Sequence, residues 1–310
     1  MPVYYRRPII TVLIALMTFA ALSGVGEAQR PRAPLPLEPG GKVGEVVWPA
    51  FEGWFRNDDG SFTLLLGYFN RNQEPVEVPI GDDNRIEPGG PDRGQPTVFE
   101  SGRGWGVFSI NVPADFGNQK LTWTLVVNGQ TAQVSFWLNP PYFVEPLLNR
   151  ANGNTPPLLT LGGDTLQGPP SGSPGGSKTV TTRVGEPLEL SASVADSALA
   201  FPAPGGAGRR DAAGRVVLSG GRRVAPLSLT WRKYRGPGDV SFTNVTADVT
   251  EAPTVRLEFE DLQGGEAVST AIFGAPGEYR LMVTVNDISG HGGGGDQCCW
   301  TTGYLDVTVK

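Results

Sequence analysis

Residues 121–138 read LTWTLVVNGQTAQVSFWL, in which two runs of β-prone residues flank an Asn-Gly pair. Asn128 and Gly129 both accept positive φ, which a type I′ turn requires at its two central positions. The stretch therefore predicts a β-hairpin of Leu121–Val127 and Gln130–Leu138. Side chains alternate between the two faces of a strand. In the first arm one face therefore carries Leu121, Trp123, Leu125 and Val127, and the other carries Thr122 and Thr124.

Further short strands are predicted before this hairpin. Residues 57–60 (NDDG) are a turn signal between two aromatic runs, which predicts a second hairpin from Phe51–Arg56 and Phe62–Phe69. Val76–Ile80 and Gly104–Val112 predict two more strands, and residues 82–95 predict a long polar loop. No stretch has a convincing helical period. An all-β domain over residues 46–148 follows.

The chain then changes composition. Residues 149–178 contain Pro-Pro and Gly-Gly pairs and the run SGSPGG, which predicts a linker that buries no core. Residues 179–310 predict a second β domain, because short β-prone runs with turn signals between them indicate an immunoglobulin-like sandwich. The predicted strands are Thr179–Val184, Leu188–Val194, Leu227–Tyr234, Thr254–Phe259, Val268–Phe273, Gly277–Val285 and Gly303–Val309.

The N-terminus has the pattern of an export signal. Arg6 and Arg7 precede an apolar run over residues 9–22, and small residues follow as far as Ala28. This pattern predicts a signal peptide over residues 1–28, with an uncleaved anchor as the alternative. The run is shorter than the ~20 residues of a membrane-spanning helix, so no transmembrane segment is expected after cleavage. Residues 29–45 then form a Pro/Gly-rich tail, and the expected location is periplasmic or extracellular.

Charge argues against polyanionic partners. Cleavage removes Arg6, Arg7 and Glu27 from a chain with 25 Lys+Arg and 31 Asp+Glu, which leaves a net charge of −7. A mildly acidic protein of this kind is not expected to bind nucleic acid or an anionic membrane nonspecifically. The expected partner is instead an unknown protein or polysaccharide at the cell envelope.

Two stretches of the second domain resemble PKD-type domains, the immunoglobulin-like modules common in secreted bacterial proteins. They are residues 229–242 (LTWRKYRGPGDVSF) and 271–287 (AIFGAPGEYRLMVTVND). The resemblance implies that Trp231 fills the core and that Tyr279 is a corner tyrosine bonded to nearby backbone. It also implies a spacer, adhesion or binding role rather than catalysis. The Ser197–Gly221 insertion and the long last loop depart from the pattern, and the first domain resembles only uncharacterised domains of exported bacterial proteins.

The last loop, residues 287–302 (DISGHGGGGDQCCWTT), holds the only histidine and the only two cysteines of the chain. In an oxidising compartment Cys298 and Cys299 pair with each other, pair with another molecule, or stay free. A disulfide between them is favoured, although it closes no long loop and so adds little stability. It would either stiffen the glycine-rich loop or form a rigid platform beside Trp300 for a ligand.

The same loop offers a mixed set of metal ligands. His291, Asp296, Cys298 and Cys299 supply one nitrogen, one oxygen and two sulfurs, which zinc or copper can use. Adjacent cysteines rarely direct both sulfurs to one tetrahedral centre, so the sequence favours no metal and no cofactor. A Cys298/His291 nucleophile pair lacks a third group, so no catalytic residue is assigned.

Tryptophans supply the remaining candidates. Trp123 lies on the apolar face of its strand and is expected in the core, whereas Trp54, Trp105 and Trp137 either join the core or stack on sugar rings. The sequence thus favours a non-catalytic exported protein, built of two β-sandwich domains, that binds or scaffolds. The alternatives are a carbohydrate-binding module that uses these tryptophans, and an enzyme with an unrecognised site.

Overall fold

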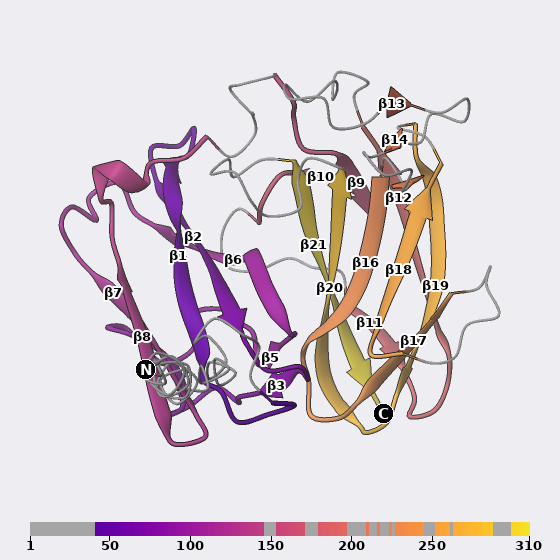
Figure 1. The fold of residues 1–310 in the computed structure, drawn as a ribbon, viewed down its shortest axis with the longest axis horizontal. Coiled ribbons are helices and arrows are strands. Elements are labelled where there is room, and N and C mark those ends of the chain that lie inside the picture. Colours follow the sequence, from indigo (N-terminus) through magenta and orange to yellow (C-terminus); the bar gives the residue numbers. More distant parts are fainter. Residues whose placement is uncertain are drawn as a thin grey trace, which may run out of the picture. The chain divides into compact units, whose positions relative to one another are not determined.

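The computed structural model describes residues 41–145, 153–170, 179–196, 227–244, 252–260, 263–287 and 299–310, and for the backbone alone residues 209–210, 216–217 and 223–224 (Figure 1). The chain divides into two units, Met1–Pro39 and Gly40–Lys310. All described residues lie in the second unit, which contains both of the predicted β domains.

The first half of this unit consists of three small antiparallel sheets. One has the strand order β1-β2-β6, the second β4-β7-β8, and the third pairs β3 with β5. The strands are β1 (Val47–Arg56), β2 (Phe62–Asn70), β3 (Val76–Glu77), β4 (Asn84–Glu87), β5 (Val98–Phe99), β6 (Gly102–Val112), β7 (Leu121–Val127) and β8 (Gln130–Phe136). A short 3-10 helix, η1 (Pro140–Tyr142), follows.

The second half consists mainly of two five-stranded sheets, ordered β10-β9-β12-β19-β17 and β11-β21-β20-β16-β18 (Figure 1). The first contains β9 (Leu158–Leu161), β10 (Asp164–Gln167), β12 (Leu188–Ala195), β17 (Val240–Asn244) and β19 (Gly265–Phe273). The second contains β11 (Thr179–Thr182), β16 (Leu227–Arg235), β18 (Thr254–Phe259), β20 (Gly277–Asp287) and β21 (Trp300–Val309).

The all-β prediction is confirmed, and no α-helix occurs in the part of the chain that the structure describes. The Asn-Gly hairpin is present as predicted, with Asn128 at φ 53° and Gly129 at φ 71° between β7 and β8. Positive φ at both positions is what a type I′ turn requires. Trp123 is fully buried and packs edge-on against Phe108, with ring centroids 5.1 Å apart.

No helix in the described ranges is long and apolar enough to span a bilayer.

The linker prediction is wrong for residues 158–167. Here β9 and β10 form a hairpin that extends the first five-stranded sheet through β12, and Leu159 is fully buried. The hydroxyl of Thr301 also donates to the carbonyl of Pro157 and accepts the amide of Gly168 at 2.9 Å. Glycine and proline dominate the segment as a whole, but its LLTLGGDTLQ core alternates well enough to pair. The high glycine and proline content of residues 149–178 as a whole conceals this short strand pattern.

The predicted polar loop 82–95 also contains a strand. β4 pairs with β7, and its residue Ile86 is fully buried. Asn84 fixes this strand: its amide donates to the carbonyls of Val78 at 3.0 Å and Pro96 at 2.8 Å, and its side-chain oxygen accepts the indole N–H of Trp123 at 3.0 Å. A buried asparagine that is fully hydrogen-bonded acts as a core residue, which its polarity conceals in the sequence.

The predicted insertion, Ser197–Gly221, is not wholly irregular. Backbone pairing joins β13 (Arg209–Arg210) to β14 (Val216–Val217), and β14 to β15 (Arg223–Val224). Its other residues lie outside the described ranges.

The core of the second half lies between its two five-stranded sheets. Trp231 is fully buried and packs with Leu229, Phe273 and Leu281 in this core. The hydroxyl of Tyr279 donates to the carbonyl of Ala275 at 2.8 Å, as the PKD resemblance implies for a corner tyrosine. An immunoglobulin-like sandwich therefore accounts for the second half, while membership of the PKD family itself stays a prediction.

The other face of the β11-β21-β20-β16-β18 sheet is covered by the first half. Tyr234 and Met282 from this face belong to the core cluster of the first half, and Tyr304 packs against that cluster. Successive residues of a strand point to opposite faces, so one sheet contributes to both cores. The two halves therefore share buried surface along β16, β20 and β21.

Candidate functional site

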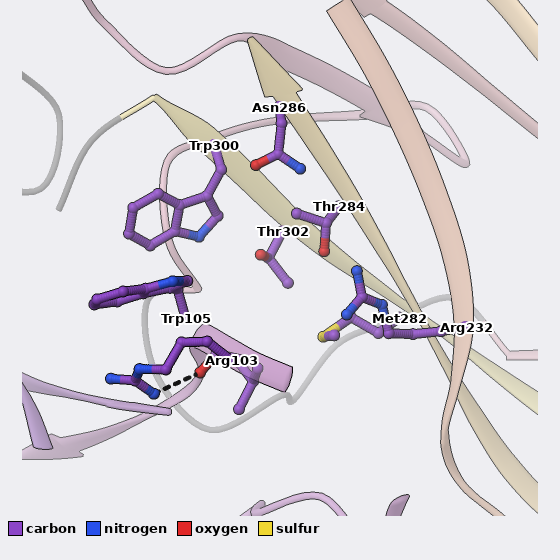
Figure 2. A pocket seen from close by; sticks show the side chains of 10 residues that line it. Arg103, Trp105, Arg232, Met282, Thr284, Asn286, Trp300 and Thr302 are labelled. Atoms are coloured by element: carbon purple, nitrogen blue, oxygen red, sulfur yellow. Dashed lines mark hydrogen bonds between the residues drawn. The ribbon is translucent and has the colours of Figure 1, made fainter. Parts of the chain in front are cut away.

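A pocket lies where the first half meets the second half. It is formed by β6 on one side and by the outer face of β16, β20 and β21 on the other, and about 60 Å³ of it is open to water (Figure 2). The lining residues are Arg103, Gly104, Trp105, Val107, Arg232, Met282, Thr284, Asn286, Trp300 and Thr302.

Two glycines let the aromatic rings approach β6. A Cβ added to Gly104 would lie 2.5 Å from the ring of Tyr68, and one added to Gly106 would lie 2.7 Å from Cζ2 of Trp300. Gly106 also has φ +47°, in the left-handed region that glycine adopts most easily. The pairing of β2 with β6 shifts register between Leu66 and Tyr68, so the strand is irregular at this point.

Arg103 forms one wall and is fully engaged there. Its guanidinium pairs with the buried carboxylate of Glu52 and donates to the carbonyl of Tyr68 at 2.6 Å. The same group lies 4.1 Å from the centroid of the Trp105 ring, within cation–π range. Arg103 therefore supports Trp105, and its charge is compensated by Glu52.

The opposite wall is built from three cross-strand pairs. Arg232 of β16 lies opposite Met282 of β20, Thr284 of β20 opposite Thr302 of β21, and Asn286 of β20 opposite Trp300 of β21. Figure 2 shows Arg232 reaching from β16 with its guanidinium toward Thr284, and the indole nitrogen of Trp300 on the side of Thr302 and Trp105. Directly opposite residues share a face, so all six side chains lie on one surface.

Two donors of this wall have no partner among the described residues. The indole Nε1 of Trp300, in a residue only 3% exposed, and the Nε of Arg232 are both buried without a hydrogen bond. Most buried polar atoms in native proteins are satisfied, so each exception calls for an explanation. Both of these atoms belong to residues that line the pocket.

Hydrogen bonds between the halves hold the two walls in register. The hydroxyl of Tyr234 donates to the carbonyl of Gly94, and that of Tyr304 donates to the carbonyl of Val107. Arg235 forms a bidentate pair with Asp92, with N–O distances of 2.8 and 3.0 Å. These contacts come from β16 and β21, two of the strands that line the pocket.

Burial governs the ionisation of groups near the site. Desolvation raises the pKa of Tyr68 to about 12, and it raises the pKa values of Tyr234 and Tyr304 as well. All three hydroxyls therefore remain protonated at neutral pH. Desolvation likewise raises the pKa of Glu100, which lies within electrostatic reach of Arg232.

The structure describes only part of the predicted loop site. Trp300 is buried in the pocket wall, and Cys299 is buried, disulfide-bonded and at φ 81°. Cys298, His291 and Asp296 lie outside the described residues, so the Cys298–Cys299 pairing and the metal set remain predictions. Within the described ranges, His, Cys, Asp and Glu side chains form no cluster that could hold a metal ion.

The three candidate tryptophans of the first half lie apart. Only Trp105 lines the pocket. Trp54 donates its indole N–H to the carbonyl of Asn139 at 2.7 Å and packs edge-on against Phe62 and Phe143. Trp137 carries the Lys120 ammonium 4.2 Å from its ring centroid.

Sequence reasoning missed Arg232, Thr284 and Asn286. They occupy alternate positions on strands whose other face is apolar, so the pattern indicates side chains directed to solvent. One signal was available in the sequence: residues 281–286 contain no charged side chain, as expected for a strand covered on both faces. The structure buries all of residues 281–287.

No protein-family model and no curated protein sequence matches the chain. Among solved structures, it is similar to the N-terminal domain of PorA, with 11% identity, 50% of this chain and 97% of that chain covered, and a TM-score of 0.25. It is also similar to the D00-D0 domain of intimin, with 10% identity, 85% and 97% coverage, and a TM-score of 0.22. A third is CfaE, the adhesive subunit of the CFA/I fimbria of enterotoxigenic Escherichia coli, with 9% identity, 90% and 81% coverage, and a TM-score of 0.24. Scores this low carry no argument about function, which therefore rests on the pocket.

Proposed function

We propose that this chain is a non-catalytic binding protein of the bacterial envelope or exterior, and that it holds its ligand in the pocket between its halves. The observation that carries the proposal is the chemistry of the lining. It offers two indole rings and several hydrogen-bond donors, and its ionisable groups are the guanidinium groups of Arg103 and Arg232. Arginine stays protonated at any physiological pH, so neither group can exchange protons as a general acid or base.

The support behind the lining also suits recognition. Glu52 and Tyr68 fix Arg103, and Arg103 in turn fixes Trp105. Tyr304 ties the other wall to β6 at Val107, itself a lining residue. A site whose side chains are already held in place loses little conformational entropy when a ligand binds.

The location and the domain division belong to the same proposal. The N-terminal pattern of residues 1–28 supports export, and two domains over residues 46–148 and 179–310 would then form one binding unit. The sharing of a core cluster by Tyr234, Met282 and the first half supports a fixed rather than a flexible arrangement of these domains.

Export is tested by expressing the full chain in a bacterium and measuring the intact mass of the protein in each cell fraction. We expect an exported form that begins at Gln29. Recovery of the complete chain in the cytoplasm alone would contradict the location.

Binding is tested by nuclear magnetic resonance on protein labelled with ¹⁵N at the tryptophan indoles. The probes are D-glucuronate, N-acetyl-D-glucosamine and N-acetyl-L-aspartate, and the Trp300 signal is assigned as the one lost in Trp300→Phe. We expect at least one probe to shift this signal saturably and to be recovered chemically unchanged. Conversion of a probe by the native chain but not by Arg232→Gln would show an enzyme, and no saturable shift with any probe would remove the pocket as the binding site.

A further inference from the structure

We propose that the group bound in the pocket is a carboxylate, held by the guanidinium of Arg232 and the indole N–H of Trp300. This inference rests on the proposed function and specifies its ligand. The acid could be a free small molecule or part of a sugar acid; the pocket recognises the carboxylate that both share.

The first reason is the unpartnered indole of Trp300. A tryptophan N–H can only donate, and burying a donor without an acceptor costs free energy. Trp300 is 3% exposed, and no described residue accepts its hydrogen bond. Gly106 lets this ring lie against β6, since any larger residue would meet its Cζ2 atom. The ring is thus held in a place where its donor has no partner among the described residues.

The second reason is the charge of Arg232. Among the described residues it takes part in no ion pair, whereas Arg103 pairs with Glu52 and Arg235 pairs with Asp92. Its Nε atom is buried without a partner. Guanidinium presents several N–H groups in one plane and can hold a carboxylate through two parallel hydrogen bonds.

The nearest competitor for Arg232 is Glu100, which does not line the pocket. Electrostatic interaction with Arg232 and Lys233 favours the Glu100 carboxylate, but desolvation outweighs it and raises the pKa of Glu100. Lys233 in turn pairs with Glu77. Arg232 therefore has a carboxylate at a distance but none in contact among the described residues.

Size and composition restrict the ligand further. About 60 Å³ open to water holds roughly four water molecules, which suits a carboxylate head but not a whole sugar ring or peptide. None of the lining side chains is acidic, so no lining group repels an anion. Thr284 and Thr302 add hydroxyls that can donate to the second carboxylate oxygen.

The test uses the ¹⁵N-indole signals of the full chain at pH 7 and constant ionic strength. Acetate is the probe, and acetamide is its uncharged counterpart of the same shape. We expect acetate to shift the Trp300 signal saturably. Acetamide should bind at least about tenfold more weakly, because hydrogen bonds to an ion are stronger. Arg232→Gln should weaken the binding of acetate by a similar factor. Trp48→Phe, at a half-exposed position on β1 away from the pocket, is the control and should leave the acetate response unchanged.

The outcomes separate this inference from the proposed function. If acetamide binds as well as acetate, or if only N-acetyl-D-glucosamine shifts the Trp300 signal, the ligand group is not a carboxylate. The pocket would still be the binding site. If D-glucuronate binds more tightly than acetate, the source is a sugar acid; equal binding indicates a free acid. If Arg232→Gln fails to fold, the difference between acetate and acetamide binding to the native chain still tests whether the pocket recognises a carboxylate.

Discussion

The two faces of the β11-β21-β20-β16-β18 sheet are both buried, yet they are built differently. The inner face is apolar and packs against the other five-stranded sheet: it carries Leu229, Trp231, Leu281, Val283, Leu305 and Val307. The outer face lies against the first half and is largely polar: it carries Arg232, Tyr234, Met282, Thr284, Asn286, Thr302 and Tyr304. The two faces thus differ in polarity although both are buried.

On the inner face, stability comes from apolar area removed from water, and partners are interchangeable so long as volume is kept. On the outer face each buried donor needs its own acceptor, and the energy depends on geometry. Tyr234 and Tyr304 find carbonyls of the first half, whereas Trp300 finds none among the described residues. The first kind of face holds a fold together, and the second can also leave a position for a ligand.

The inner face should show the largest effect of a single substitution. Trp231→Ala removes a fully buried indole and leaves a cavity between the two sheets, so we expect a loss of about 3–5 kcal/mol in the free energy of unfolding. Urea denaturation measures it. Trp48→Ala, at a half-exposed indole, is the control and should cost far less. Equal losses for the two variants would contradict the assignment of Trp231 to the core.

The contact of Gly106 with Trp300 should give the next largest effect. Gly106→Ala adds both left-handed backbone strain and a Cβ only 2.7 Å from the indole, so we expect a loss of about 2–3 kcal/mol. Gly117→Ala is a matched control, because Gly117 has a similar φ of +58° and its nearest atom lies 3.7 Å away. It should cost about 1 kcal/mol from strain alone. The same cost for both variants would show that Trp300 does not press on β6.

The difference between the two faces determines how much of this sheet the sequence could predict. The strands of the inner face follow from alternation of Leu229, Trp231, Leu281 and Val283 with polar residues, and the Asn128-Gly129 turn follows from its φ requirement. The alternating polar residues of the outer face do not by themselves predict that it is covered, since a solvated face shows the same pattern. The first half covers that face, and its residues are distant in sequence from β16, β20 and β21.

The missed strands have similar causes. β4 is anchored by Asn84 and β9 starts within a Gly/Pro-rich segment, so composition pointed to loops in both places. In each case tertiary contacts override local composition: the asparagine satisfies buried carbonyls, and Leu159 completes a core built by residues more than 30 positions later. In the site, the sequence already pointed to Trp105 and Trp300 as candidate aromatic residues. Only the fold shows that they line one pocket together with Arg232.

The tyrosine contacts between the halves should have smaller effects. Tyr234→Phe and Tyr304→Phe each remove one hydroxyl and leave a carbonyl of the first half without that donor, so each should cost about 1 kcal/mol. Thermal unfolding measures the loss, and Tyr142→Phe at a half-exposed ring should change nothing. Tyr304→Phe should also weaken acetate binding, because its acceptor Val107 lines the pocket. An unchanged melting temperature in both variants would mean that the outer face is not held by these bonds.

The carboxylates nearest the outer face should give the smallest effects, with opposite dependence on pH. Hydrogen bonding from Arg235 lowers the pKa of Asp92, so its contribution to stability is present at neutral pH and is lost as pH falls below the ordinary range of the carboxyl. Desolvation raises the pKa of Glu100, so the folded state binds this proton more tightly than the unfolded state. Stability therefore falls as pH rises from the ordinary carboxyl pKa of 4.5 through the raised pKa.

Asp92→Asn should therefore destabilise the protein more at pH 7 than at pH 3, and Glu100→Gln should stabilise it more at pH 7 than at pH 3, each by less than about 1 kcal/mol. Urea denaturation at both pH values measures the two differences. Glu100→Gln should in addition strengthen acetate binding at pH 7, because Arg232 would lose its competing charge. Weaker acetate binding in Glu100→Gln would mean that Glu100 positions Arg232 rather than competing for it, and the polar face would then be preorganised by its charges as well as by its hydrogen bonds.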